Sequence, residues 1–198
     1  MYNIGIVGSG KWAKIVAKNI ILNRHFNLNS ISYNGFDKKD KHFFNLSSFS
    51  DFRSMIDSNI IDCIYVAANP KVNLDVFEYS KKKKMPIILE KPLSNSFYSS
   101  AVIEKYLLKE KFPVLVNLPN IYSETFGPVS KFINNNKNKI KKITIFEGNY
   151  GPFREKIHPI WDWGSHSISL VIKLLNGDSV IKIEKKEIKI DKFSKNRL

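Results

Sequence analysis

Two stretches of this sequence carry side chains that could move protons. In the first, Glu90, Lys91 and Pro92 end an apolar run that is typical of a buried strand, because proline lacks the N–H that a continuing central strand needs. Lys91 would then lie at the carboxyl end of a strand, which is where ligands bind in open parallel sheets. Taken alone, the pattern also fits an ordinary solvated lysine at a strand end.

The second stretch contains Asp162 and His166. They are four residues apart within 161–175, where apolar spacing predicts a helix, so both side chains would share one helix face. A carboxylate beside a histidine orients the ring and supports its protonated form during general acid–base catalysis. By itself the pair is more typical of a capping aspartate and a histidine on a helix face. A zinc site would need a third ligand, for which only His158 is a candidate, and we expect no metal.

A glycine turn near the N-terminus predicts a dinucleotide site. Residues 8–13 fit the pattern G-x-G-x-x-A and join a predicted strand (2–7) to a predicted helix (12–22). The first glycine permits a tight turn, the second lets the backbone approach a pyrophosphate, and the helix N-terminus offers N–H groups to phosphates. The alternative is a purely structural turn. The candidate cofactor-binding residues here are Gly8, Ser9, Gly10, Lys11 and Trp12.

The expected cofactor is NAD or NADP. The second predicted strand (28–33) ends at Asn34, a further candidate cofactor residue, where folds specific for NAD usually place an acid for the ribose 2′-OH. Asp37 follows, beside Lys38 and Lys39. The missing acid and the nearby cations favour NADP.

The composition and net charge restrict which classes of protein this sequence can belong to. The 198 residues are 43% hydrophobic, which suffices for a substantial core. The net charge of +14 would suit a nucleic-acid partner, but the lysines are spread along the chain and we expect no such partner.

Cys63 is the single cysteine, so no disulfide can form within the chain. No apolar run reaches transmembrane length and the start resembles no signal peptide. We therefore expect a cytoplasmic protein without a membrane partner.

Alternating strands and helices predict an α/β fold with a doubly wound parallel sheet over residues 1–118. Residues 119–198 predict a partial α+β domain that could bind substrate or form a homo-oligomer through its last strand. The predicted strands of the first part are 2–7, 28–33, 60–68, 86–89 and 113–116, and its helices include 49–58 with Ser50 as N-cap and one that Ser94 or Asn95 caps. The predicted elements of the second part are a helix at 122–133, a strand at 140–150, a helix at 161–175 and a strand at 180–193.

In combination these motifs resemble the family of glucose–fructose oxidoreductase, inositol dehydrogenase and MocA (Gfo/Idh/MocA). Residues 8–13 resemble its first turn, and 67–70 (Ala-Ala-Asn-Pro) resemble the end of its fourth strand. Residues 90–92 match its E-K-P motif, and Asp162 and His166 match its D-x-x-x-H motif. The resemblance covers roughly residues 2–190.

The resemblance implies hydride transfer between a nicotinamide and a hydroxyl-bearing carbon of a sugar, sugar nucleotide or cyclitol. Lys91 would then touch the substrate oxygen and the nicotinamide ribose, His166 would be the general acid or base, and Asp162 would orient substrate or histidine. The resemblance further implies cofactor contacts from Ala68, Asn69, Pro70 and Glu90.

The sequence departs from the family pattern in two places and in length. Asn73 replaces the usual histidine at the start of a crossover helix, and Ser167 replaces an acid that often follows the helix histidine. The second domain is shorter than the family's. The alternative function is therefore a non-catalytic dinucleotide-binding module or a degenerate remnant of the family.

Overall fold

One parallel sheet organises the protein. The computed structural model describes residues 1–32, 46–147, 159–175 and 177. The sheet has six strands in the order β3-β2-β1-β4-β5-β6, and every pair of neighbours is parallel. This confirms the predicted doubly wound fold. The strands are β1 (Tyr2–Val7), β2 (Phe26–Ser32), β3 (Ser47–Phe49), β4 (Cys63–Val66), β5 (Ile87–Glu90) and β6 (Val114–Asn117).

The order of the strands reverses between β1 and β4, because the chain leaves the edge strand β3 and returns to the middle of the sheet as β4. In open α/β sheets ligands bind at such a switch point, beyond the carboxyl ends of the strands. The sheet therefore places the ends of β1, β4 and β5 side by side at the edge where a site is expected.

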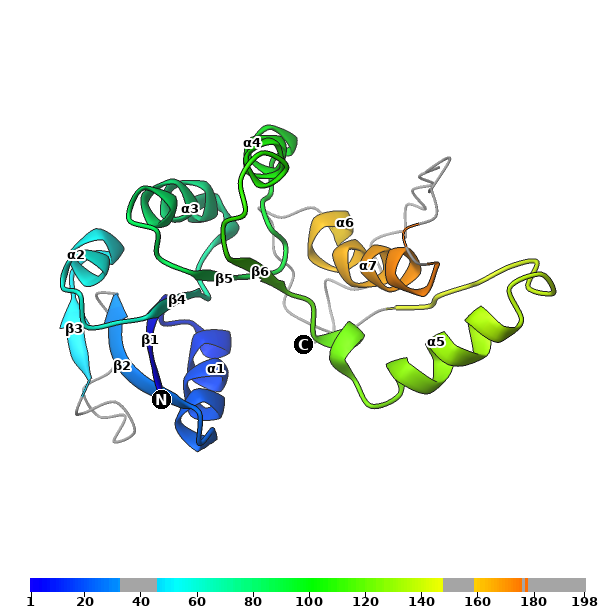
Figure 1. The fold of residues 1–198 in the computed structure, drawn as a ribbon, viewed down its shortest axis with the longest axis horizontal. Helices are drawn as coiled ribbons and strands as arrows, with labels where there is room; N and C mark the ends of the chain where they lie inside the picture. The colour runs from blue at the N-terminus through cyan, green and yellow to red at the C-terminus, as the bar shows by residue number, and fades with distance from the viewer. Residues whose placement is uncertain (33–45, 148–158, 176, 178–198) are drawn as a thin grey trace, which may run out of the picture.

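Helices cover both faces of the sheet (Figure 1). One face carries α1, and α2, α3 and α4 lie on the opposite side. Their bounds are α1 (Lys11–Leu22), α2 (Phe52–Asp57), α3 (Asn73–Lys82) and α4 (Phe97–Leu107). The alternation along β1 shows how two cores form: Ile4 and Ile6 pack against α1, whereas Val7 belongs to the cluster on the other face with Met55 of α2 and Val76 of α3.

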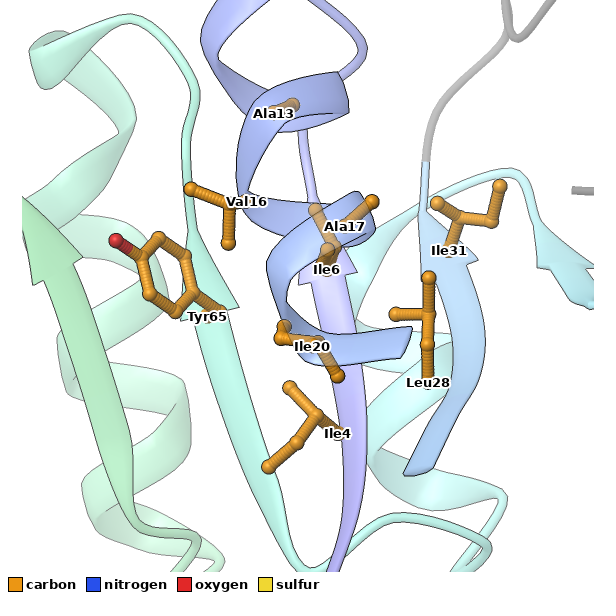
Figure 2. Packing of buried hydrophobic residues seen from close by; sticks show 9 residues of the cluster. All are labelled: Ile4, Ile6, Ala13, Val16, Ala17, Ile20, Leu28, Ile31 and Tyr65. Atoms are coloured by element: carbon orange, nitrogen blue, oxygen red, sulfur yellow. The ribbon is translucent and has the colours of Figure 1, made fainter. Parts of the chain in front are cut away.

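The α1 core is closed by small and β-branched side chains (Figure 2). Ala13 and Ala17 have no exposed surface, so the helix backbone lies close against the sheet. Tyr65 of β4 extends the same cluster. Its phenolic oxygen is the polar end of a mostly apolar side chain, and such a group needs a hydrogen-bond partner when it is buried.

After β6 the chain forms a helical region beside the sheet (Figure 1). A short 3-10 turn, η3 (Pro119–Tyr122), precedes α5 (Phe126–Asn135), and α6 (Pro159–Asp162) is followed by α7 (Gly164–Leu174). The helix predicted at 122–133 begins later, at Phe126, and Pro128 lies in its first turn, where a proline is tolerated. The boundary proposed between residues 118 and 119 stays a prediction.

Three predictions about local structure are wrong. Asp51, not Ser50, caps α2, and its carboxylate accepts hydrogen bonds from the N–H groups of Arg53 and Ser54 at 2.7 and 3.1 Å. The helix starts later than predicted because Phe49 pairs with β2 as part of β3. Ser96, rather than Ser94 or Asn95, caps α4.

The third concerns residues 140–147, where a strand was predicted and none is present. Alternation shows which side chains could share a face, but a strand also needs a hydrogen-bonded neighbour. The strand predicted at 180–193, and the oligomer contact attached to it, lie outside the described residues. Among the described helices, none is long and apolar enough to cross a bilayer.

Candidate functional site

The glycine turn after β1 presses against the end of β4. Gly8 has a φ of +118°, and a Cβ on it would lie 2.3 Å from the carbonyl oxygen of Ala67. The N–H of Ala67 in turn donates to the carbonyl of Val7 at 2.8 Å. Only glycine fits this turn without moving backbone, so Gly8 is fixed by the packing of the turn itself.

Gly10 has a different reason to be glycine. Its backbone is in an ordinary extended conformation (φ −66°, ψ 174°), and no atom lies within 4 Å of the place where its Cβ would be. It is the N-cap of α1, whose first N–H groups donate no hydrogen bond to a capping side chain. Open space over uncapped N–H groups suits an anionic group such as a pyrophosphate, so these residues fit the predicted dinucleotide.

A groove continues from the turn along α1. It has a volume of about 490 Å³ and is lined by Ser9, Lys11, Lys14, Ile15 and Lys18. The three lysines give it a positive lining, and α1 has no acidic residue in its first turn. Trp12, also predicted to contact cofactor, is 45% exposed at the start of the helix.

The segment after β4 borders the same edge of the sheet. Asn69 is exposed, and its side chain accepts a hydrogen bond from the N–H of Lys71 at 3.1 Å, which caps the 3-10 turn η2 (Pro70–Val72). Ala68 packs against the core on the α3 side. The predicted candidates Ala68, Asn69 and Pro70 therefore lie beyond the carboxyl end of β4, between the glycine turn and the end of β5. Asn34 lies outside the described residues.

Lys91 and Asp162 meet across 71 positions of the sequence. The Lys91 ammonium donates to the Asp162 carboxylate at 2.9 Å and to the backbone carbonyl of the same residue at 2.9 Å. The side chains are only 18% and 10% exposed, so the pair is poorly screened by water. Lys91 follows β5, two strand spacings or about 10 Å along the sheet from the end of β1.

His166 lies beside this pair and is 9% exposed. Burial, followed by the positive charge of Lys91, lowers its pKa below 6.5, so the imidazole is neutral at pH 7. Within the described part of the chain, its buried Nδ1 has no hydrogen-bond partner. A neutral, half-enclosed imidazole next to an ammonium can accept a proton from a group bound between them.

The helix predicted over residues 161–175 is divided between Asp162 and His166. The chain does not form one helix across them, because α6 ends at Asp162 and α7 begins at Gly164. His166 lies in the first turn of α7, and the Asp162 carboxylate is hydrogen-bonded to Lys91. The motif therefore brings the acid to the lysine. Sequence spacing alone suggested that it would serve the histidine.

Glu90 is held in a buried network that the sequence did not reveal. It is 7% exposed, and its Oε1 accepts hydrogen bonds from the phenol of Tyr65 and from the amide of Asn117, the latter at 2.7 Å. The Asn117 amide also donates to the Tyr65 oxygen at 2.9 Å. Burial and this neighbouring carboxylate raise the pKa of Tyr65 well above its usual value. The one available signal was a tyrosine within an otherwise apolar buried strand.

Asn73, the residue that replaces the usual family histidine, supports the loop after Lys91. It is 2% exposed, and its amide donates to the carbonyls of Pro92 and Leu93 at 3.4 and 3.0 Å. It starts α3, so it ties this helix to the end of β5.

Cys63, also named by the sequence, has no part in this geometry. Burial raises the pKa of the Cys63 thiol to about 11, which leaves it protonated and unreactive. His158 lies outside the described residues. Among the residues that are described, no group of three or more histidine, cysteine, aspartate or glutamate side chains is placed to hold a metal ion.

The strand order, the glycine turn and the open helix N-terminus define a dinucleotide-binding protein of the Rossmann type. The chain belongs to the Gfo/Idh/MocA family: residues 2–117 match the family described as an oxidoreductase family with an NAD-binding Rossmann fold. The family confirms the expected resemblance and a nicotinamide cofactor, and the preference for NADP stays a prediction. No curated protein matches the chain.

Solved structures share the fold at low sequence identity. Scyllo-inositol dehydrogenase from Lactobacillus casei, with bound NAD(H) and scyllo-inositol, has a TM-score of 0.63 at 18% identity over 69% of this chain. Myo-inositol 2-dehydrogenase from Lactobacillus plantarum has a TM-score of 0.62 at 16% identity over 69%. Biliverdin reductase from Synechocystis sp. PCC 6803, with biliverdin and NADP+, has a TM-score of 0.66 at 20% identity over 87%. The match spans 42%, 42% and 58% of those chains, respectively.

Proposed function

We propose that this protein is an NAD(P)-dependent oxidoreductase that transfers a hydride between the nicotinamide and a hydroxyl-bearing carbon of a sugar, sugar nucleotide or cyclitol. The observation that carries the proposal is the pairing of Lys91 with Asp162 beside a neutral His166, at the carboxyl edge that also holds the glycine turn. The inositol dehydrogenases among the similar structures support the substrate class.

Each side chain has a role that follows from its chemistry. Oxidation of a secondary alcohol removes a hydride from carbon and a proton from oxygen, giving a ketone. The bound nicotinamide supplies the hydride chemistry. His166, neutral at pH 7, takes the hydroxyl proton, and the Lys91 ammonium donates a hydrogen bond to the oxygen as negative charge develops on it. In the reverse direction the protonated His166 returns the proton.

Asp162 sets the position of Lys91. Two hydrogen bonds to one residue hold the ammonium in place, which leaves its third N–H for the substrate oxygen. Lys91 and His166 therefore have different roles: the lysine donates a hydrogen bond to the substrate oxygen, and the histidine accepts the proton.

Purified protein should oxidise at least one member of a panel of sugars, sugar nucleotides and cyclitols with NAD+ or NADP+, followed by the rise in nicotinamide absorbance. His166→Gln should lower kcat by about 100-fold, because a positioned base contributes about 10²–10⁴ in rate. Tyr106→Phe is the control, since Tyr106 lies away from the site on α4. If the protein binds the dinucleotide tightly but transfers a hydride from no member of the panel, the proposal is refuted.

The alternative is a dinucleotide-binding module without turnover. The observation in its favour is that the family match covers residues 2–117, the part of the chain that forms the sheet and the glycine turn. The two proposals predict the same cofactor binding. They differ in that a module would keep its cellular role when Lys91 and His166 are replaced by alanine.

A further inference from the structure

Three residues that are not among the predicted site residues surround the end of β5. Tyr65 and Asn117 bind Glu90, immediately before Lys91, and Asn73 binds the carbonyls of Pro92 and Leu93, immediately after it. We propose that Tyr65, Asn117 and Asn73 are positioning residues that fix the lysine from both sides, and we call these three residues the clamp. The idea rests on the proposed function only in giving Lys91 its role in chemistry.

The network before Lys91 joins side chains from three neighbouring strands. Glu90 and Asn117 are register partners on β5 and β6, and Tyr65 comes from β4 on the other side of β5. Because Glu90 is 7% exposed, its carboxylate depends on these two donors for much of its stabilisation, and losing one would leave it poorly satisfied. The donors therefore hold the last residue of β5 in one conformation.

Holding Glu90 also decides which carboxylate pairs with Lys91. An ammonium in a half-buried place is drawn to any nearby anion, and Glu90 is adjacent in sequence. Successive residues of a strand point to opposite faces, and Glu90 points to the face that carries Tyr65. With two donors on Glu90, the ammonium is left to Asp162 at 2.9 Å.

The contact after Lys91 acts on the backbone. Asn73 is 2% exposed, and its side chain reaches 19 and 20 residues along the chain to its two acceptors. A side-chain amide that donates to two consecutive carbonyls sets the direction in which the loop leaves the strand. The hydrogen bonds from Asn73 to the loop therefore explain a donor side chain at position 73 without any contact with substrate.

The test measures Lys91 itself. An amine-acylating reagent at low dose, followed by peptide mass spectrometry, gives the labelling rate of Lys91 relative to exposed Lys131. Tyr65→Phe removes one oxygen and keeps the ring in the α1 core, and Asn117→Ala removes the amide. Each should raise the relative labelling of Lys91 by about fivefold, the ratio that corresponds to one net hydrogen bond of ordinary strength.

Two further variants extend the test. Asn73→Ser, which removes the amide donor, should raise the labelling of Lys91 in the same way. The matched control is Tyr106→Phe, which removes a phenol that also donates to a carboxylate, that of Glu110, on the exposed surface of α4. It should leave Lys91 unchanged.

The result is separate from turnover. A selective rise at Lys91 would support the clamp even in a protein that oxidises no substrate, which would count only against the proposed function. Unchanged Lys91 labelling in Tyr65→Phe and Asn117→Ala would overturn the clamp. An equal rise at Lys91 and Lys131 would overturn it as well, because general loosening of the sheet would then explain the change.

Discussion

The two glycines of the first turn should respond in opposite ways to one added methyl group. Gly8→Ala places a Cβ 2.3 Å from a backbone oxygen of Ala67, whereas Gly10→Ala places it in open space. The same chemical change, two residues apart, therefore separates the glycine that the fold requires from the one that the ligand requires.

The cost at Gly8 has two parts. A side chain at a φ of +118° costs about 1–3 kcal/mol. Relieving the overlap moves the end of β4 away from β1, which strains the 2.8 Å hydrogen bond from Ala67 to Val7, worth about 1 kcal/mol. The total, about 2–4 kcal/mol, is a large part of the 5–15 kcal/mol that stabilises a typical domain.

Gly10→Ala should keep or slightly raise stability, by about 0.4–1 kcal/mol, because alanine fits this backbone and restricts the unfolded chain. Its dinucleotide affinity should nevertheless fall by at least about tenfold, since the methyl group stands where a pyrophosphate approaches the turn. Urea unfolding gives the free energies, and titration of nicotinamide fluorescence gives the affinities for NADH and NADPH.

The control is Gly127→Ala. Gly127 lies in α5, and a Cβ there also meets no atom within 4 Å, so dinucleotide affinity should not change. Wild-type affinity in Gly10→Ala would refute the reasoning, because the space above the turn would then not be the cofactor's. Wild-type stability in Gly8→Ala would show that the turn can shift without cost.

Three further predictions concern charge. Because burial and Lys91 lower the pKa of His166 below its unfolded value of 6.5, the unfolded chain takes up this proton first, and the free energy of unfolding should fall as pH drops from 6.5 through the folded pKa. His166→Gln should flatten that slope between about pH 7.5 and about pH 5.5 in urea unfolding, and an unchanged slope would contradict the assignment. Lys91→Met should cost about 2–3 kcal/mol by leaving the Asp162 carboxylate without its ammonium, and adding Asp162→Asn should recover part of it; simple additivity of the two losses in a double-mutant cycle would argue against the pair. Replacing Lys14 and Lys18, which line the groove along α1, with glutamine should weaken the binding of NADH and NADPH about 2- to 5-fold, with the loss shrinking at high salt; unchanged affinity for both cofactors would exclude a contribution from the charge of the groove.

Much of the fold is local information that the sequence carries directly. Apolar runs such as Ile4 to Val7 predict buried strands, and the glycines at 8 and 10 predict a tight turn, because each depends only on residues within one turn or strand. The first residue of a helix is less well defined by the local sequence. Both Ser50 and Asp51 are good N-caps, and only the pairing of β3 with β2 decided that α2 begins after Asp51.

The site shows the same division. The sequence by itself supplied the candidates, because Gly8 belongs to a glycine turn between a strand and a helix, and Lys91 and His166 lie in motifs that resemble those of the family. The tertiary structure alone decided the partners: that Asp162 pairs with Lys91, and that Tyr65 holds Glu90. Those contacts join positions 71 and 25 residues apart, and pairing over such separations is set by how the strands and helices pack, which no local spacing encodes.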